Sequence, residues 1–157
     1  MQKIIMFGVI KSLHDLFTAL WIGGLFTTAI TFMPVLKKNK GKSTESKSIL
    51  LGYQRKLRVV FLVSVIGLWI TGILLSKRSE TYEGFLSFST TYSTLVSIKH
   101  LTIFVMIVVA FLRGFVLGEK IENFQPKQEK VYAALLILNT ILGIVVIVLS
   151  GISAALG

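Results

Sequence analysis

Four long apolar blocks constrain this chain more than any other feature. They cover residues 13–36, 57–76, 94–117 and 131–155. A bilayer core about 30 Å thick takes about 20 apolar residues per helix, so each block is long enough to span it. With 54% hydrophobic residues, the chain has no room for a separate soluble domain. We therefore predict an all-α integral membrane protein, with residues 1–157 as a single antiparallel four-helix bundle.

Composition excludes several kinds of chemistry. Cysteine is absent, which rules out disulfides, thiolate metal sites and cysteine-linked haem. A net charge of +10 would suggest nucleic acid in a soluble protein, but no nucleic-acid motif accompanies it. In a membrane protein the same excess reports topology and contact with anionic lipid. We therefore expect the lipid bilayer, and no nucleic acid, as a partner.

The basic residues also predict the orientation of the spans. Twelve of the 17 lysines and arginines lie in or beside the first and third connections, and five lie at the opposite ends of the spans. The positive-inside rule places the twelve in the cytoplasm. We therefore predict a multi-pass protein of the cytoplasmic membrane with both termini outside. Arg113, deeper than the other inner cations, is expected to snorkel or to pair with Glu119.

The only two histidines, His14 and His100, are predicted near the outer surface. His14 lies 22 residues before Leu36, and His100 lies 17 before Leu117. At a rise of 1.5 Å per residue, the two histidines differ in depth by roughly 7 Å. Helix tilt, or a shift of a span end by a few residues, is enough to bring them to the same depth. In an up-down-up-down bundle the first and third helices are diagonal. Two imidazoles reaching inward from them can bind one metal ion from opposite sides.

This arrangement suits a six-coordinate haem iron, so haem b is the predicted cofactor. Gly72 and Gly151 are among the small residues that would let a porphyrin lie between the second and fourth spans. Lys11 and Lys99 are among the cations available for its propionates. Trp21, two turns after His14, would pack against the cofactor edge or in the core.

Two alternatives to haem remain open. Small residues also let membrane helices pack closely, so a packing subunit without cofactor is one of them. Copper is the other, with His14, His100 and Met6 as entry ligands and Met106 less than two turns beyond His100. The four methionines form no Met-x-x-Met motif, which favours haem over copper.

The chain resembles the copper-resistance D (CopD) membrane domain. The first span carries a histidine at 14, Trp21-Ile-Gly-Gly24 and a proline at 34, and the third begins Lys99-His100-Leu101. The resemblance implies copper handling in the cytoplasmic membrane. Related HemJ-type and small b-type cytochrome proteins imply haem b between helices, although Thr27–Phe32 lacks the Arg and Tyr of the HemJ pattern.

Our leading hypothesis from the sequence is thus a haem b electron-transfer protein. Its donor or acceptor at the outer surface would be a quinone, superoxide or a redox partner, and whether it is a membrane oxidoreductase stays open. Copper transport or copper tolerance is the alternative.

Overall fold

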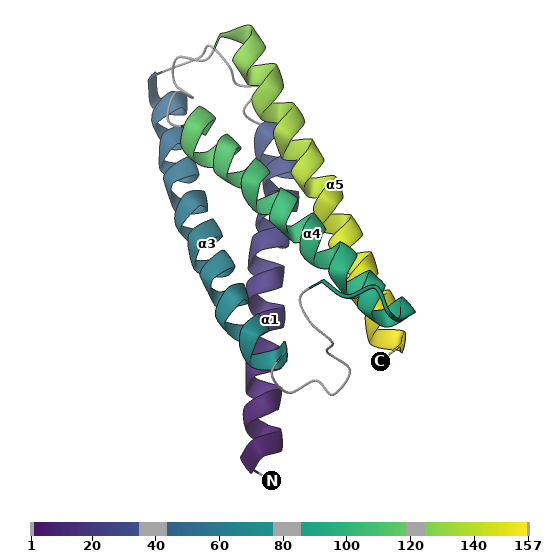
Figure 1. Ribbon diagram of the computed structural model, residues 1–157. Coiled ribbons are helices and arrows are strands. Elements are labelled where there is room, and N and C mark those ends of the chain that lie inside the picture. The colour runs from purple at the N-terminus through teal and green to yellow at the C-terminus, as the bar shows by residue number, and fades with distance from the viewer. Residues whose placement is uncertain (1, 35–43, 77–85, 119–124, 157) are drawn as a thin grey trace.

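The computed structural model describes residues 2–34, 44–76, 86–118 and 125–156, and this part of the chain is mostly helical, with bends at residues 86–90 and no strand (Figure 1). Its helices are α1 (Gln2–Phe26), the π-helix η1 (Thr27–Phe32), α3 (Thr44–Ser76), α4 (Thr91–Phe111), the π-helix η2 (Leu112–Leu117) and α5 (Pro126–Leu156). Four stretches are long and apolar enough to cross a membrane, namely Ile4–Thr31, Leu51–Ser76, Thr91–Leu117 and Lys127–Leu156. The prediction of an all-α protein with four membrane spans is confirmed.

Two helices begin earlier than their apolar blocks indicated. α1 is helical from Gln2, eleven residues before the predicted start of the first span at 13. α3 begins at Thr44, so residues 44–56, ahead of the apolar block at 57–76, are helical as well. The leucines, lysines, glutamine and arginine of residues 44–56 are good helix formers, and they outweigh the single glycine there. Residues 37–43 lie outside the described part of the chain.

The spans form two antiparallel helix pairs. α1 packs along α3, and α4 packs along α5. The pairs meet because α1 and η1 contact α5, while η2 contacts α3 and α5. α1 and α4 are therefore diagonal, as predicted for the first and third spans. Both chain ends lie at one end of the bundle, together with the end of α3 and the start of α4 (Figure 1).

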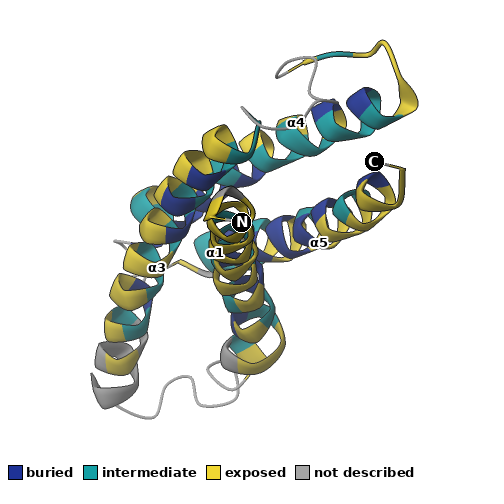
Figure 2. Cartoon of the chain, turned by 90° about the horizontal axis from the view of Figure 1, so that it is seen from below, coloured by how far each residue is buried: buried dark blue, intermediate teal, exposed yellow. Residues whose placement is uncertain are grey.

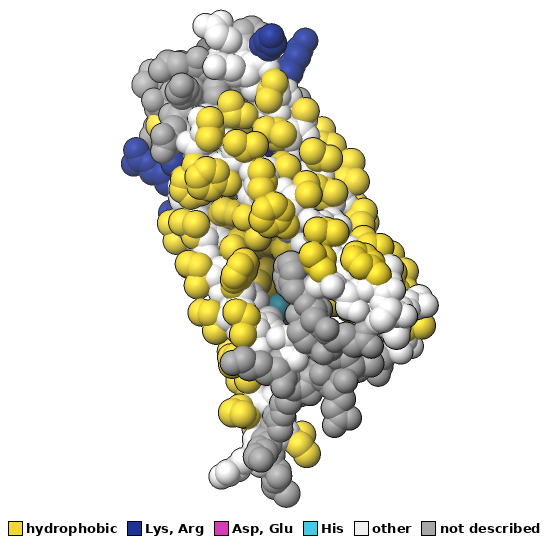
Figure 3. All heavy atoms as spheres, in the orientation of Figure 1, with side chains coloured by type: hydrophobic (Ala, Val, Ile, Leu, Met, Phe, Trp, Pro, Cys, Tyr) yellow, Lys and Arg dark blue, Asp and Glu magenta, His cyan; other side chains and the backbone are white. Residues whose placement is uncertain are grey.

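The buried core lies between the helix pairs, whereas large apolar side chains cover the outside (Figures 2 and 3). It is centred on Trp21, Ile22, Leu25, Met106, Leu136 and Val146. On the face shown in Figure 3, lysine and arginine side chains gather at the end where α3 and α5 begin. An apolar outer surface of this kind is what a lipid-embedded bundle presents to acyl chains.

Polar side chains within the spans bond mostly to their own helices. Thr18, Thr28 and Thr140 each donate a hydrogen bond to the carbonyl four residues earlier. α4 starts with a reciprocal capping box between Thr90 and Ser93. α5 starts at Pro126, a residue suited to the first helical position. Hydrogen bonds between side chains of different helices include His14–Thr71, Thr28–Tyr53 and Arg113–Tyr132.

Candidate functional site

His14 on α1 makes a hydrogen bond that fixes which of its ring nitrogens is available. Its Nδ1 lies 2.9 Å from Oγ1 of Thr71 on α3. That hydroxyl lies 2.6 Å from the carbonyl oxygen of Gly67, to which it donates its only hydrogen. It therefore accepts from Nδ1–H of the imidazole. The lone pair of the neutral ring is then on Nε2, which has no hydrogen-bond partner among the described residues and can bind a metal ion.

The surroundings of His14 include a closely packed glycine and several charged residues. A Cβ atom added at Gly72 would lie 3.7 Å from Cε1 of His14, an ordinary van der Waals contact, so Gly72 lies directly beside the ring. Lys11 and Lys99 both lie within electrostatic range of the imidazole, as does Asp15. Lys11 pairs with Asp15 at 3.3 Å in an exposed contact. Lys99 on α4 is thus brought toward α1 from across the bundle.

His100 follows Lys99 on α4 and is half-buried, with an Nδ1 atom that solvent does not reach. The two histidines therefore lie on diagonal helices at the same end of the bundle. Histidine atoms are visible between the helices on the face shown in Figure 3. Among the residues that the structure describes, no group of three or more His, Cys, Asp or Glu side chains could hold a metal ion.

The other predicted residues lie in different surroundings. Trp21 is buried and packs edge-on against Phe61, with ring centroids 5.6 Å apart, so it belongs to the core. Gly151 on α5 is exposed, and an added Cβ would meet nothing within 4 Å. Met106 is also a core residue and is 1% exposed. Met6 is 56% exposed on the first turns of α1.

A second polar cluster lies toward the other end of the bundle and was not predicted. Arg113 of η2 donates from Nη1 to the Tyr132 hydroxyl at 2.9 Å, and Nε2 of Gln54 on α3 donates to the same oxygen. All three residues are buried, so Arg113 does not snorkel outward, and Glu119 lies outside the described residues. The sequence signal for this cluster was the charge of Arg113 inside an apolar block, because an ionisable residue within a membrane span is by default a candidate functional residue.

A comparison with protein families identifies the group to which this bundle belongs. The family model described as copper resistance protein D matches residues 53–155, about two thirds of the chain. The chain belongs to the copper resistance protein D family. No curated protein and no solved structure matches it.

The copper resistance protein D match covers the two sites unequally. Thr71, Gly72 and His100 lie within the matched residues, and so do the three members of the Arg113 cluster. His14 lies before the matched residues, on α1. The matched residues therefore include Thr71, whose hydroxyl orients the imidazole, but they do not include His14 itself.

Proposed function

We propose that the protein binds copper ions at the histidine end of the bundle and carries them into or across the membrane. Membership of the copper resistance protein D family supports copper as the metal. The single structural observation that supports this site is the His14–Thr71 hydrogen bond, which leaves Nε2 of the imidazole as a donor. Copper ions accept imidazole ligands.

The small number of candidate ligands suits a transported ion. The proposed set is His14, His100 and Met6, two imidazoles and one thioether, with copper as cargo rather than as a resident cofactor. A transport site has to bind its ion well enough for entry and weakly enough for release. The predicted orientation, with the cation-rich connections in the cytoplasm, would place this set at the outer surface.

Copper uptake into liposomes tests this proposal. The purified protein is reconstituted into vesicles that contain a fluorescent Cu(I) chelator, and Cu(I) is added outside. We expect uptake by the natural protein and background uptake by His14→Ala and His100→Ala. Ser12→Ala, an exposed position on α1, is the matched control and is expected to transport normally. Normal uptake by His14→Ala would refute the proposed site.

Haem b is the second candidate, and the cations around His14 favour it. Lys11 and Lys99 would repel an incoming metal cation but attract the propionates of a haem. His14 and His100 are the residues that would hold the iron. Held there, haem would supply one-electron transfer to a quinone or to a redox partner at the outer surface.

The visible spectrum separates the two candidates. A protein purified from haem-sufficient cells that shows Soret and α bands, both lost in His14→Ala, would establish haem and displace the copper proposal. A colourless protein that binds Cu(I) through the same histidine would establish copper.

A further inference from the structure

Side-chain hydrogen bonds join all four spans at the end of the bundle opposite the histidines. The Thr28 hydroxyl of η1 lies 2.9 Å from the Tyr53 hydroxyl of α3, within hydrogen-bond distance. The next residue, Gln54, donates to the Tyr132 hydroxyl of α5, and Arg113 of η2 donates to the same oxygen at 2.9 Å. These five residues form the Tyr132 network, which ties the helix pair α1–α3 to the pair α4–α5.

The Tyr132 network closes its end of the bundle. Thr28, Gln54 and Tyr132 are each 1% exposed, and Arg113 is 7% exposed. Tyr132 lies only five residues after the start of the fourth span at Lys127, which is about 8 Å along the helix axis. Polar side chains this close to a span end bond to water wherever water reaches them. Their burial and their bonds to one another therefore indicate a closed end.

Asn139 lies behind the network, on the same face of α5 as Tyr132. It follows Tyr132 by seven residues, which is two helical turns and about 10 Å toward the middle of the span. One turn further, a Cβ added at Gly143 would lie 3.3 Å from Ile22 of α1 and 3.6 Å from Met106 of α4. This face of α5 therefore points into the bundle, between the two helix pairs.

The Asn139 side chain is buried without hydrogen bonds. It is 0% exposed, and neither its amide nitrogen nor its amide oxygen has a partner among the described residues. A buried amide without partners is costly, and a membrane offers it no water as a substitute. A conformation in which water reaches Asn139 removes this cost, so the closed state is opposed by the very group that it buries.

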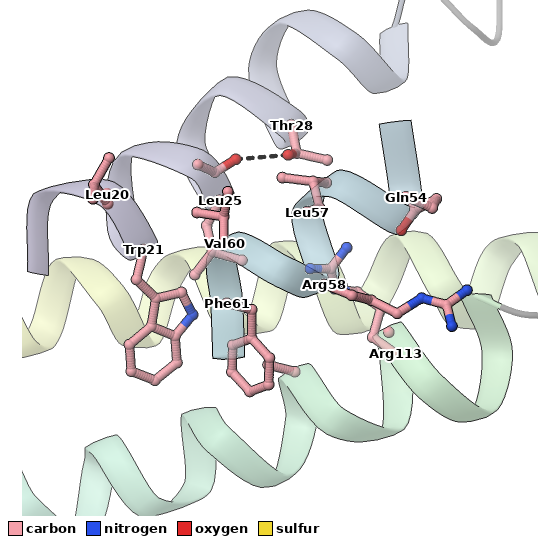
Figure 4. A pocket seen from close by; sticks show the side chains of 13 residues that line it. Leu20, Trp21, Leu25, Thr28, Gln54, Leu57, Arg58, Val60, Phe61 and Arg113 are labelled. Carbon is pink, nitrogen blue, oxygen red and sulfur yellow. Dashed lines mark hydrogen bonds between the residues drawn. The ribbon is translucent and has the colours of Figure 1, made fainter. Parts of the chain in front are cut away.

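Two features next to the network allow movement there. Thr28 and Arg113 lie in the π-helices η1 and η2, and π-helical turns are rare and often found at functional sites. A cavity of about 30 Å³ borders Thr28, Gln54 and Arg113, which Figure 4 shows toward one side of it, away from Trp21. Packed interiors have few voids larger than a water molecule, so side chains can shift here without displacing their neighbours.

We propose that the Tyr132 network is a gate, closed in this structure, whose opening lets water and the transported copper ion pass Asn139. In the open state the hydrogen bonds to the Tyr132 hydroxyl are broken, the two helix pairs part at this end, and water hydrates the Asn139 amide. An ion bound at the histidine end needs such an opening to leave at the opposite end. The gate rests on the proposed transport function, but its test needs no metal ion.

Cysteine accessibility tests the gate, because the natural chain has no cysteine. Asn139→Cys is the reporter, since the amide makes no hydrogen bond that the change would break. The full chain is placed in lipid nanodiscs without copper, and its reaction with a charged maleimide is followed by mass spectrometry. We expect about tenfold faster labelling when Tyr132→Phe is added, because a hydrogen bond to a charged group is lost. Tyr92→Phe, the same deletion on α4, is the matched control and should leave the rate unchanged.

A second reporter separates gate opening from a general loosening of the bundle. Ser153→Cys, at a buried position near the other end of α5, should react at the same rate with and without Tyr132→Phe. Equal acceleration of both reporters, or no acceleration at Asn139→Cys, would overturn the gate. If Tyr132→Phe does not fold, Gln54→Leu replaces it, because it removes one hydrogen bond and keeps the bond from Arg113. Faster labelling at Asn139→Cys alone, in a protein that takes up no Cu(I), would support the gate and refute only the transport function.

Discussion

Replacing Gly67 with alanine will place a methyl group against the ring of Phe17 and weaken the packing of the first two spans. Gly67 lies on α3 directly against the ring of Phe17 on α1. A Cβ added there would lie 2.4 Å from Cε2, 2.5 Å from Cδ2 and 2.6 Å from Cζ of that ring. Carbon atoms in contact prefer separations of about 3.5–4.0 Å, so either the ring moves by about 1 Å or the helices part.

The size of the effect follows from two opposing terms. Overpacking of this kind typically costs about 1–3 kcal/mol. Alanine also stabilises a helix by about 1 kcal/mol relative to glycine. Gly52 lies on the same helix, and a Cβ added there meets nothing within 4 Å. Gly52→Ala therefore gains helix propensity without overpacking, so the difference between the two variants gives the cost of overpacking alone. We therefore expect Gly67→Ala to be less stable than Gly52→Ala by about 1–3 kcal/mol.

Unfolding by SDS in mixed micelles measures this difference in the free energy of unfolding. The same pair of substitutions is made in a Phe17→Ala background, where the ring is absent. There the difference between the two glycine positions should disappear, because the atoms that clash are gone. Equal stabilities of Gly67→Ala and Gly52→Ala in the natural background would refute the close approach of α1 and α3 at this point.

Three further substitutions test single contacts. Thr71→Val removes the hydroxyl that orients His14. If the site binds copper as proposed, this change should lower the affinity for Cu(I), measured by competition with a chelator, by about 10–100-fold. Thr71→Ser keeps the hydroxyl and should keep the affinity. Tyr132→Phe leaves two buried donors without their acceptor and should lower the free energy of unfolding by about 1–3 kcal/mol, against no comparable loss for Tyr92→Phe. Asp15→Asn breaks an exposed helical ion pair and should change that free energy by only about 0.2–0.5 kcal/mol; a larger loss in the same SDS titration would contradict its exposed position.

The spans were predictable because the hydrophobic composition of a segment largely determines whether it inserts into a membrane. A run of apolar residues long enough for a bilayer leaves few alternatives, and the antiparallel order of four such runs makes the first and third helices diagonal. The start of α3 at Thr44 was missed because hydropathy marks where a helix enters lipid, not where it begins. The π-helices η1 and η2 have no local signature, since they differ from α-helix by only one residue in the hydrogen-bond spacing.

Contacts between helices were the harder part to predict. The Thr71 hydroxyl that holds His14 comes from another span, 57 residues away in the chain. Pairing of this kind depends on helix rotation and register, which single-span periodicity does not determine when apolar residues surround the helix on all sides. The cluster of Arg113 with Tyr132 was missed for the same reason. The charge of Arg113 was visible, but its partners on two other helices were not.

The hydrogen-bond chain from the His14 ring through Thr71 to the Gly67 carbonyl determines whether a proton is released when a metal ion binds. The ring already carries its hydrogen on Nδ1, so a metal ion that arrives at Nε2 displaces no proton from the neutral imidazole. Loading would then add the full charge of the ion to a region that already contains Lys11 and Lys99. Occupancy of such a site responds to ionic strength and to the membrane potential, because each of these changes the work of bringing a positive charge there.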